Sequence, residues 1–403
     1  MNSATPAMLL GGLNVTRALG LGGVPVIVAS VEADNPAFAS RYCVERLLLP
    51  PLDDRGAVLD ALLRAGKRLA ASVGARVPLF YSNDDWQGLV QDYRAELAPH
   101  YALLLNEPEI ADAVIEKDRF QALAAARGLP VPRTLSWQGL EDFDKPVLVK
   151  PRSKFNWDAS AVHAQLFAQS GKAAVFPTGR ALAADPTARL LREQLLVQEY
   201  IAGDDRNIWS FHGFCDETGR LLDWFVGRKI RTYPALTGTS TFLELAHDDA
   251  VTALGGRIAS QLGLKGVFKI DLKRDALSGD TRLLEINARY NLWHYLGAAN
   301  GVNLTRTAYD YLLHGARPSA PGRYGSARRW VYLRYDWRAY RQLAARGELG
   351  LWGWLGSLAG APLVCQLFAW SDPLPFFSVL RGLFKSKLPR LTAVLRRWLS
   401  TAS

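Results

Sequence analysis

Apolar and polar residues alternate most clearly in a late segment of the chain, where the pattern predicts a β-hairpin. Two apolar runs, Val267–Leu272 and Arg282–Ile286, flank a stretch of Ser, Gly and Asp residues that form turns. With the turn centred on residues 276–279, Asp271 falls opposite Glu285 on the partner strand. Residues that face each other in this way have Cβ atoms about 4.5–5.5 Å apart. The pattern therefore predicts two neighbouring carboxylates.

Asn287 and Arg289 continue the alternation, so they should lie on the same face as Glu285. Two adjacent carboxylates among apolar residues are costly unless a cation lies between them. Magnesium takes carboxylate and amide oxygens and completes its octahedron with phosphate oxygens. A guanidinium beside such a site suits a transferred phosphoryl group or an acyl phosphate. The alternative is an ordinary hairpin with surface acids and a salt bridge to Arg289.

The N-terminal pattern predicts a parallel sheet. Met8–Leu10 and Val24–Val31 are expected as strands around a helix at Val15–Leu21, which makes one βαβ unit. The glycines between them do not form the G-x-G-x-x-G pattern of dinucleotide-binding proteins. A further strand, Val77–Tyr81, is followed by Asn83, which either lines the ligand edge of the sheet or caps a helix.

The central pattern predicts elements that carry charged residues at their ends. We expect a helix over Ala111–Arg127, which contains Lys117, and strands over Pro146–Lys150 and Leu195–Ile201. A lysine that ends a buried strand can serve a phosphate as a point charge, although each lysine alone is more often a solvated surface residue.

A dense basic group, Gly227–Arg231, precedes a loop rich in hydroxyl side chains at 237–241. Clustered positive charge beside such a loop suits the recognition of phosphate or carboxylate groups. An exposed basic edge strand is the alternative explanation.

Composition narrows the class of protein. The 403 residues are 49% hydrophobic and carry a net charge of +10, which is enough apolar material for two or three domains. Three widely spaced cysteines suggest free thiols in a reduced compartment. We find no signal peptide, no membrane span and no nucleic-acid-binding pattern, so we expect a cytoplasmic protein that binds no nucleic acid.

The C-terminal tail has a different composition. Phe376–Leu399 contains six lysines or arginines and no acid, and its apolar residues recur near helical spacing around Pro389. This pattern suits a helix on an anionic membrane surface, which would place the protein at the inner membrane face. A helix packed on the preceding domain, with a solvated basic face, is the alternative.

Taken in order, these residues resemble the motifs of the ATP-grasp superfamily, most of all its carboxylate–amine ligase group. The resemblance covers about Ala111 to Gly315 and implies an α/β fold of the α+β ATP-grasp type. It implies an N-terminal α/β domain over 1–110, a two-lobed ATP-grasp domain over 111–318 and an aromatic, basic extension over 319–403.

The resemblance also implies roles for the matched positions. These are Lys117 and Lys150 at the ATP phosphates, Gln198, Glu199 and Ile201 at adenine, and Asp205 at the ribose hydroxyls; Asp271, Glu285 and Asn287 at two magnesium ions; and Arg289, Lys229 and Arg231 at the transferred group. The family usually has glutamate where Asp205 stands and proline where Ala288 stands.

The function implied by the resemblance is ligation of a small carboxylate to an amine, with ATP and Mg2+, or Mn2+ in its place. A homodimer is compatible with this interpretation. The family's glycine-rich phosphate loop is here the glycine-free run 152–158. That departure keeps open a nucleotide-binding regulatory protein without turnover. A small-molecule kinase on the same fold is a further alternative.

Overall fold

The computed structural model describes residues 4–152, 166–167, 173–236 and 238–383, and it divides into two compact units. The first unit combines Met1–Leu103 with the chain from Cys365 onward, and the second is Leu104–Val364. This division differs from the three consecutive segments expected from the sequence. Residues 319–364 belong to the second unit, and the segment after them returns to the first.

The first unit contains a parallel sheet in the order β3-β2-β1-β4-β5, as the βαβ pattern predicts. Its strands are β1 (Ala7–Leu10), β2 (Val26–Ser30), β3 (Cys43–Leu48), β4 (Val77–Tyr81) and β5 (Tyr101–Ala102). The α-helices between these strands are α1 (Leu13–Leu21), α2 (Arg55–Val73), α3 (Asp84–Asp92) and α4 (Arg94–Leu97). The side chain of Asn83 accepts a hydrogen bond from the Trp86 backbone N–H, so Asn83 caps α3.

A buried ion pair holds the returning C-terminal segment within the first unit. The Arg17 guanidinium on α1 donates to the Asp372 carboxylate over 3.0 Å, and both side chains are 1% exposed. Arg17 also donates to backbone carbonyls of the segment, among them Leu367 at 2.8 Å. The Asp372 carboxylate accepts further hydrogen bonds from the Ser40 hydroxyl and the Arg41 backbone N–H.

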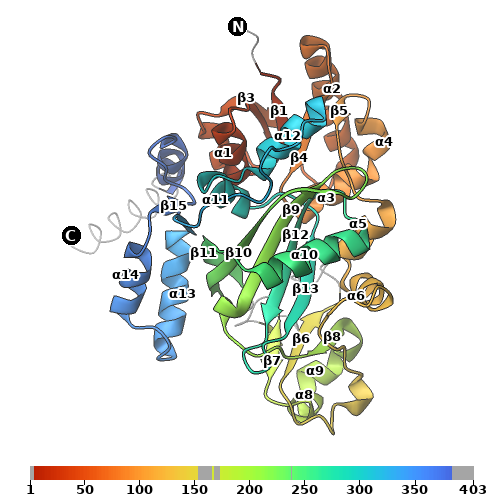
Figure 1. Cartoon of the computed structure of the whole chain (residues 1–403), viewed down its shortest axis with the longest axis vertical. Coiled ribbons are helices and arrows are strands. Elements are labelled where there is room, and N and C mark those ends of the chain that lie inside the picture. Colours follow the sequence, from red (N-terminus) through yellow and green to blue (C-terminus); the bar gives the residue numbers. More distant parts are fainter. Residues whose placement is uncertain (1–3, 153–165, 168–172, 237, 384–403) are drawn as a thin grey trace, which may run out of the picture. The chain divides into compact units, whose positions relative to one another are not determined.

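The second unit is built on a seven-stranded sheet in the order β13-β12-β9-β10-β11-β14-β15 (Figure 1). The strands are β9 (Ile208–Cys215), β10 (Leu221–Tyr233), β11 (Thr239–Leu245), β12 (Gly266–Arg274), β13 (Thr281–Asn287), β14 (Arg329–Val331) and β15 (Leu363–Cys365). A separate small sheet, in the order β7-β6-β8, consists of β6 (Val147–Pro151), β7 (Ala174–Phe176) and β8 (Leu195–Glu199). This sheet has its own apolar core with α8 (Gly179–Ala184) and α9 (Pro186–Leu190). The two-lobed architecture expected from the sequence is therefore present.

Further helices described in the second unit are α5 (Pro108–Ile115), α6 (Lys117–Ala126), α10 (Asp249–Leu262), α11 (Trp293–Ala299), α12 (Leu304–His314), α13 (Leu333–Ala345) and α14 (Leu351–Ala359). The single helix expected over Ala111–Arg127 is wrong. Glu116 has extended backbone angles (φ −96°, ψ 120°) and separates α5 from α6. No helix of the described residues is both long and apolar enough to cross a membrane.

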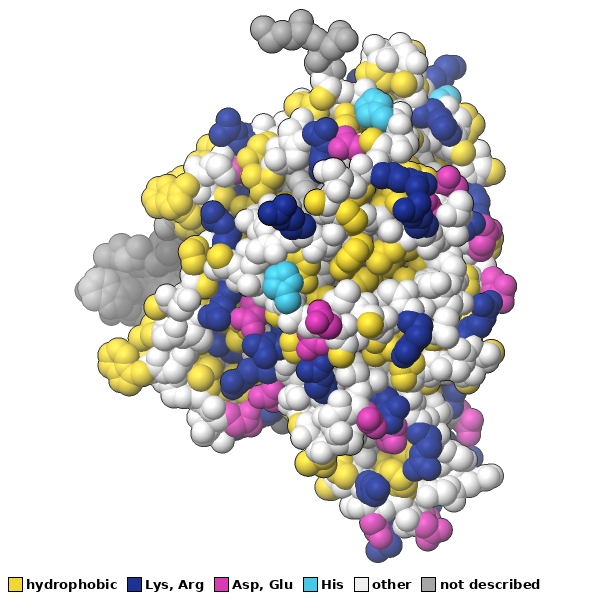
Figure 2. Space-filling model, viewed as in Figure 1, with side chains coloured by type: hydrophobic (Ala, Val, Ile, Leu, Met, Phe, Trp, Pro, Cys, Tyr) yellow, Lys and Arg dark blue, Asp and Glu magenta, His cyan; other side chains and the backbone are white. Residues whose placement is uncertain are grey.

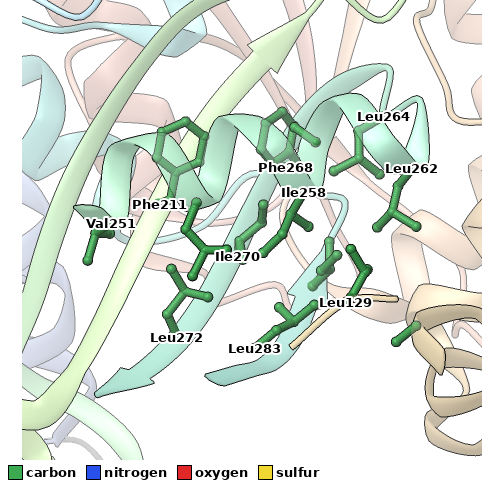
Figure 3. Close-up of a cluster of buried hydrophobic side chains, with 14 of the residues drawn as sticks. Leu129, Phe211, Val251, Ile258, Leu262, Leu264, Phe268, Ile270, Leu272 and Leu283 are labelled. Carbon is green, nitrogen blue, oxygen red and sulfur yellow. The ribbon is translucent and has the colours of Figure 1, made fainter. Parts of the chain in front are cut away.

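Helix α10 covers one face of the large sheet and forms the main core with it (Figure 3). Val251, Ile258 and Leu262 recur at helical spacing on its inner face. They meet alternate residues of β12, among them Phe268 and Ile270, which are fully buried. Because alternate residues of a strand point to opposite faces, Lys269, Asp271 and Lys273 project from the other face of the sheet.

Candidate active site

The β12–β13 hairpin has the register that its sequence predicts. Asp271 pairs with Glu285, and Lys269 pairs with Asn287. The Asn287 amide donates to Glu285 Oε1 over 3.3 Å, and Arg289 donates to Asn287 Oδ1 over 3.3 Å. Asp271 and Asn287 are buried, whereas Glu285 is exposed. The hairpin therefore presents two carboxylates, an amide and a guanidinium on one side of the sheet.

Asp271 lies among positive charges. The Lys269 ammonium donates to Asp271 Oδ2 over 2.6 Å, and the Lys229 ammonium on β10 is 3.8 Å from the same oxygen. The Ser210 hydroxyl on β9 donates to the other oxygen, Oδ1. Burial lowers the pKa of Lys269, and the charges of Asp271 and Glu285 oppose that shift.

Lys269 and Ser210 do not figure among the residues singled out from the sequence. Lys269 could have been found from the alternation, because it lies two residues before Asp271 on the same strand. Ser210 could not, because its place beside Asp271 depends on the pairing of β9 with β12, and two other strands lie between them along the chain.

The donor set fits a divalent cation that is shared with a phosphate ligand. Asp271, Glu285 and Asn287 supply hard oxygen atoms, which Mg2+ prefers. In the described part of the chain, no three or more His, Cys, Asp or Glu side chains are grouped as they would be in an all-protein metal site. Two carboxylates and an amide suit an ion whose coordination is completed by phosphate oxygens and water.

The small sheet contributes a second group of candidate residues. The register of β6 with β8 pairs Lys150 with Leu196 and Leu148 with Gln198, so these four side chains share one face. Burial lowers the pKa of Lys150, and the Glu285 carboxylate opposes that shift, which places Lys150 within electrostatic reach of the hairpin. A cavity of about 560 Å³ lies against Leu196 and is also lined by residues of α6 and by 131–134.

The candidate adenine residues make hydrogen bonds to the segment that precedes β6. The Gln198 amide donates to the Pro132 carbonyl over 3.4 Å, and Glu199 Oε1 accepts from the Arg133 backbone N–H over 3.0 Å. Ile201 is 7% exposed. The side chain of Lys117 and residues 153–158 lie outside the described residues.

Asp205, the candidate ribose residue, already holds the end of β10. Its carboxylate accepts from the Thr232 backbone N–H at 2.7 Å, the Thr232 hydroxyl at 2.9 Å and the Leu236 backbone N–H at 3.1 Å. Burial raises the pKa of Asp205 despite these hydrogen bonds. Both carboxylate oxygens thus have partners within the protein.

Lys273 is a third residue that the sequence analysis did not single out. It lies two residues beyond Asp271 on β12, and its ammonium is 4.6 Å from the centre of the Tyr200 ring. Burial lowers the pKa of Lys273 to about 8, and Asp205 is the largest of the nearby charges that oppose the shift. The cation therefore lies beside the candidate nucleoside residues.

Arg231 lies in a different environment from Lys229. Its guanidinium forms a two-pronged ion pair with Asp336 of α13, at 2.9 and 2.8 Å. It also donates to the Ser357 hydroxyl over 2.9 Å and is 4.5 Å from the centre of the Phe242 ring. The structure does not bring Arg231 into the cluster around Asp271, and these contacts favour a role in anchoring α13.

Two buried histidines lie next to the cluster and were not anticipated from the sequence. His212 of β9 pairs with Lys269, and its ring is 5.9 Å from that of His294 on α11. Among the described residues, neither ring nitrogen of His212 has a hydrogen-bond partner, and neither does Nε2 of His294. Burial lowers the pKa of His212 well below its usual value and that of His294 to about 4.

Comparison with known proteins identifies several similar chains. No family model matches the sequence. A D-aspartate ligase of Enterococcus faecium (strain Aus0004) is 21% identical over 301 residues, which cover 69% of each chain. Among solved structures, the L-amino acid ligase of Bacillus licheniformis has a TM-score of 0.55 at 13% identity, over 78% of this chain and 75% of that one.

Two further solved structures match as well. N5-carboxyaminoimidazole synthetase of Staphylococcus aureus, complexed with ADP, has a TM-score of 0.55 at 14% identity and covers 78% of each chain. The biotin carboxylase domain dimer of Hydrogenobacter thermophilus 2-oxoglutarate carboxylase, in complex with MgADP, ADP and bicarbonate, has a TM-score of 0.55 at 13% identity, over 80% of this chain and 72% of that one.

Proposed function

Since this chain has the ATP-grasp fold of the carboxylate–amine ligases, we propose that it is an ATP-dependent ligase that activates a carboxylate as an acyl phosphate and joins it to an amine. One observation carries the proposal. The β12–β13 hairpin holds Asp271, Glu285 and Asn287 on one side of the sheet, within electrostatic reach of Lys150 on the small lobe.

The order of residues along β12 gives the proposed direction of the nucleotide. Lys273 lies beside Tyr200 and Asp205, where the nucleoside would bind. Asp271 is the next residue on the same face, and Lys269 follows it. The triphosphate would therefore run from Lys273 toward Lys269, with its terminal phosphoryl group beyond Asp271.

Asp271, Glu285 and Asn287 would hold Mg2+, which when bound would neutralise phosphate charge. Lys150 would bind phosphate oxygens from the small lobe, as Lys117 would by the resemblance. Lys229 and Arg289 would stabilise the charge that develops on the transferred group, and we add Lys269 to them because it lies 2.6 Å from Asp271. Arg231 stays a prediction for this role, and its ion pair with Asp336 makes it the weakest of the set.

The chemistry requires positioning more than covalent catalysis. A substrate carboxylate oxygen forms a bond to the γ-phosphorus while the bond to the ADP oxygen breaks. The amine nitrogen then attacks the acyl carbon, phosphate leaves, and the nitrogen loses a proton. The amine must reach the acyl carbon from the Lys269 side, because the nucleotide occupies the Lys273 side.

Release of ADP by the purified protein tests the proposal. ATP and Mg2+ are supplied with a panel of small carboxylates and amines, and the D-aspartate ligase relative makes D- and L-aspartate the first acids to try. We expect ADP and phosphate in equal amounts together with an amide that mass spectrometry identifies. A stable phosphate ester would favour a kinase, and tight ATP binding without any product would favour a regulatory protein.

Three predictions about the cofactor and partners come from the sequence alone. Mn2+ as a substitute, a homodimer and peripheral contact of the basic tail with the inner membrane face stay predictions. Most of that tail, residues 384–403, lies outside the described residues.

A further inference from the structure

Helix α14 is an apolar helix with no buried residue. Its sequence, LWGWLGSLA, contains no charged side chain, and a helix that is apolar on every side is normally buried. Trp352 is 83% exposed, and Leu351 and Leu355 are 44% and 40% exposed. Something outside the described part of the unit is therefore expected to cover α14.

Among the described residues, α14 is attached to the rest of the unit through the side that carries Trp354. The Trp354 indole donates to Asp336 over 2.8 Å, and its ring is 5.3 Å from Trp337 and 5.2 Å from Tyr340 of α13. At about 100° per residue, Leu351, Leu355 and Trp352 fall within an arc of about 100°, and Trp352 lies nearly opposite Trp354. The exposed apolar residues of α14 therefore form a continuous stripe.

Helix α13 adds positive charge next to this stripe. Its inner side is fixed by the buried residues Asp336 and Ala339. Arg334, Arg338 and Arg341 recur at helical spacing on the outer side and are all exposed. Figure 2 shows Lys and Arg side chains beside apolar ones along the left edge, where Figure 1 places α13 and α14.

The charge of this surface decides what kind of partner it suits. Residues 333–359 contain four exposed arginines, the three named above and Arg346, but one exposed acid, Glu348. The other acid, Asp336, is buried in its ion pair with Arg231. Exposed Trp and Leu side chains beside several arginines are typical of helices that lie in the interface of an anionic bilayer. Helix α14 has nine residues, which is too short to cross a bilayer.

We propose that the α13–α14 hairpin is a membrane-docking surface that binds anionic bilayers, with the Leu351, Trp352 and Leu355 side chains inserted among the headgroups and the α13 arginines on the lipid phosphates. The residues of this surface, 333–359, belong to a different segment of the sequence from the basic C-terminal tail, Phe376–Leu399. It does not depend on the proposed ligase activity, because its outward residues are not among those assigned to the candidate active site.

Vesicle co-sedimentation of the full chain tests the docking surface. The wild-type protein should bind vesicles of phosphatidylcholine with phosphatidylglycerol and should not bind phosphatidylcholine alone. Trp352→Ser with Leu355→Ser should weaken binding at least about tenfold. The matched control is Leu190→Ser with Leu277→Ser, which removes two apolar side chains that are 74% and 89% exposed elsewhere in the same unit and should leave binding unchanged.

Two further measurements keep the test decisive. Lipids brominated in the upper acyl chain should quench part of the wild-type tryptophan fluorescence, and Trp352→Phe should remove that part. Replacing Lys385, Lys387 and Arg390 by glutamine separates the tail from the hairpin. The proposal is overturned if the wild-type protein does not bind vesicles. It is also overturned if the tail replacement abolishes binding while the Trp352/Leu355 variant still binds.

Discussion

Two buried aspartates of the second unit, Asp336 and Asp271, form ion pairs with different kinds of cation. The Asp336 carboxylate accepts two hydrogen bonds from Arg231, one from the Thr241 hydroxyl and one from the Trp354 indole, all within 2.9 Å. Asp271 meets two lysine ammonium groups, 2.6 and 3.8 Å away, and one hydroxyl. A guanidinium fork fixes geometry, whereas an ammonium is a point charge on a flexible stem.

The comparison separates carboxylates that hold the fold from carboxylates that can exchange partners. Asp205 belongs with Asp336, because backbone N–H groups and a hydroxyl occupy both of its oxygens. Asp271 belongs with Glu285, whose side chain is exposed on the same side of the hairpin. We expect the first kind to show its importance in stability and the second in turnover.

The largest effect is expected at Asp336. Asp336→Ala should lower the free energy of unfolding by about 3–5 kcal/mol, because it leaves the Arg231 guanidinium buried without its partner. Denaturant unfolding measures this change. As a control, Asp144→Ala removes an ion pair to Arg180 whose side chains are 71% and 66% exposed. The control should cost at most about 1 kcal/mol, and similar losses in the two variants would contradict the comparison.

Glu285 should show the opposite behaviour. Glu285→Ala should lower turnover by about 10²–10³-fold, since it removes a ligand of the phosphate-bound cation. Its free energy of unfolding should change by less than about 0.5 kcal/mol, because the side chain is exposed. Asp280→Ala, at an exposed carboxylate of the same hairpin, is the matched control for turnover. Full activity of Glu285→Ala would remove the metal site from the proposal.

The buried His294 extends the comparison to the pH dependence of stability. The pKa of His294 is lowered to about 4, so the unfolded chain binds a proton that the folded chain does not between about pH 6.5 and 4. Stability should therefore fall as the pH drops through that window, by up to about 3 kcal/mol from this residue. His294→Gln should flatten the dependence of the unfolding free energy on pH, which denaturant unfolding at several pH values between 4 and 6.5 measures.

The smallest effect is expected at Asp205. Asp205→Asn keeps one acceptor oxygen and loses the other, which should lower the free energy of unfolding by about 1–3 kcal/mol. A residue that only bound ribose would behave differently, with an increased KM for ATP and unchanged stability. Measuring both quantities on the same variant distinguishes the two roles.

Local pattern was sufficient to predict the hairpin and its register. Alternation and turn residues place Asp271 opposite Glu285 within 15 residues of sequence, and the structure has that pairing. The fold class is confirmed as well. The parallel sheet follows from periodic segments of ordinary length, whereas the two lobes were implied by the resemblance to the ATP-grasp superfamily.

Features that depend on distant partners could not be predicted in this way. Arg231 meets Asp336 from 105 residues away, so its basic character alone suggested a phosphate ligand. Asp205 likewise takes its partners from the end of β10. Strand β14 has three residues, which is too short for alternation to reveal it.

Strand β14 also decides where this chain can be divided. Phe242, Leu243 and Glu244 of β11 pair with Val331, Trp330 and Arg329, and the Trp330 side chain is 1% exposed. A shortened enzyme that ended near residue 318 would uncover the outer rim of β11, whose unpaired amides and carbonyls could recruit a strand from another molecule. Any search for a minimal active fragment must therefore keep the segment that contains β14.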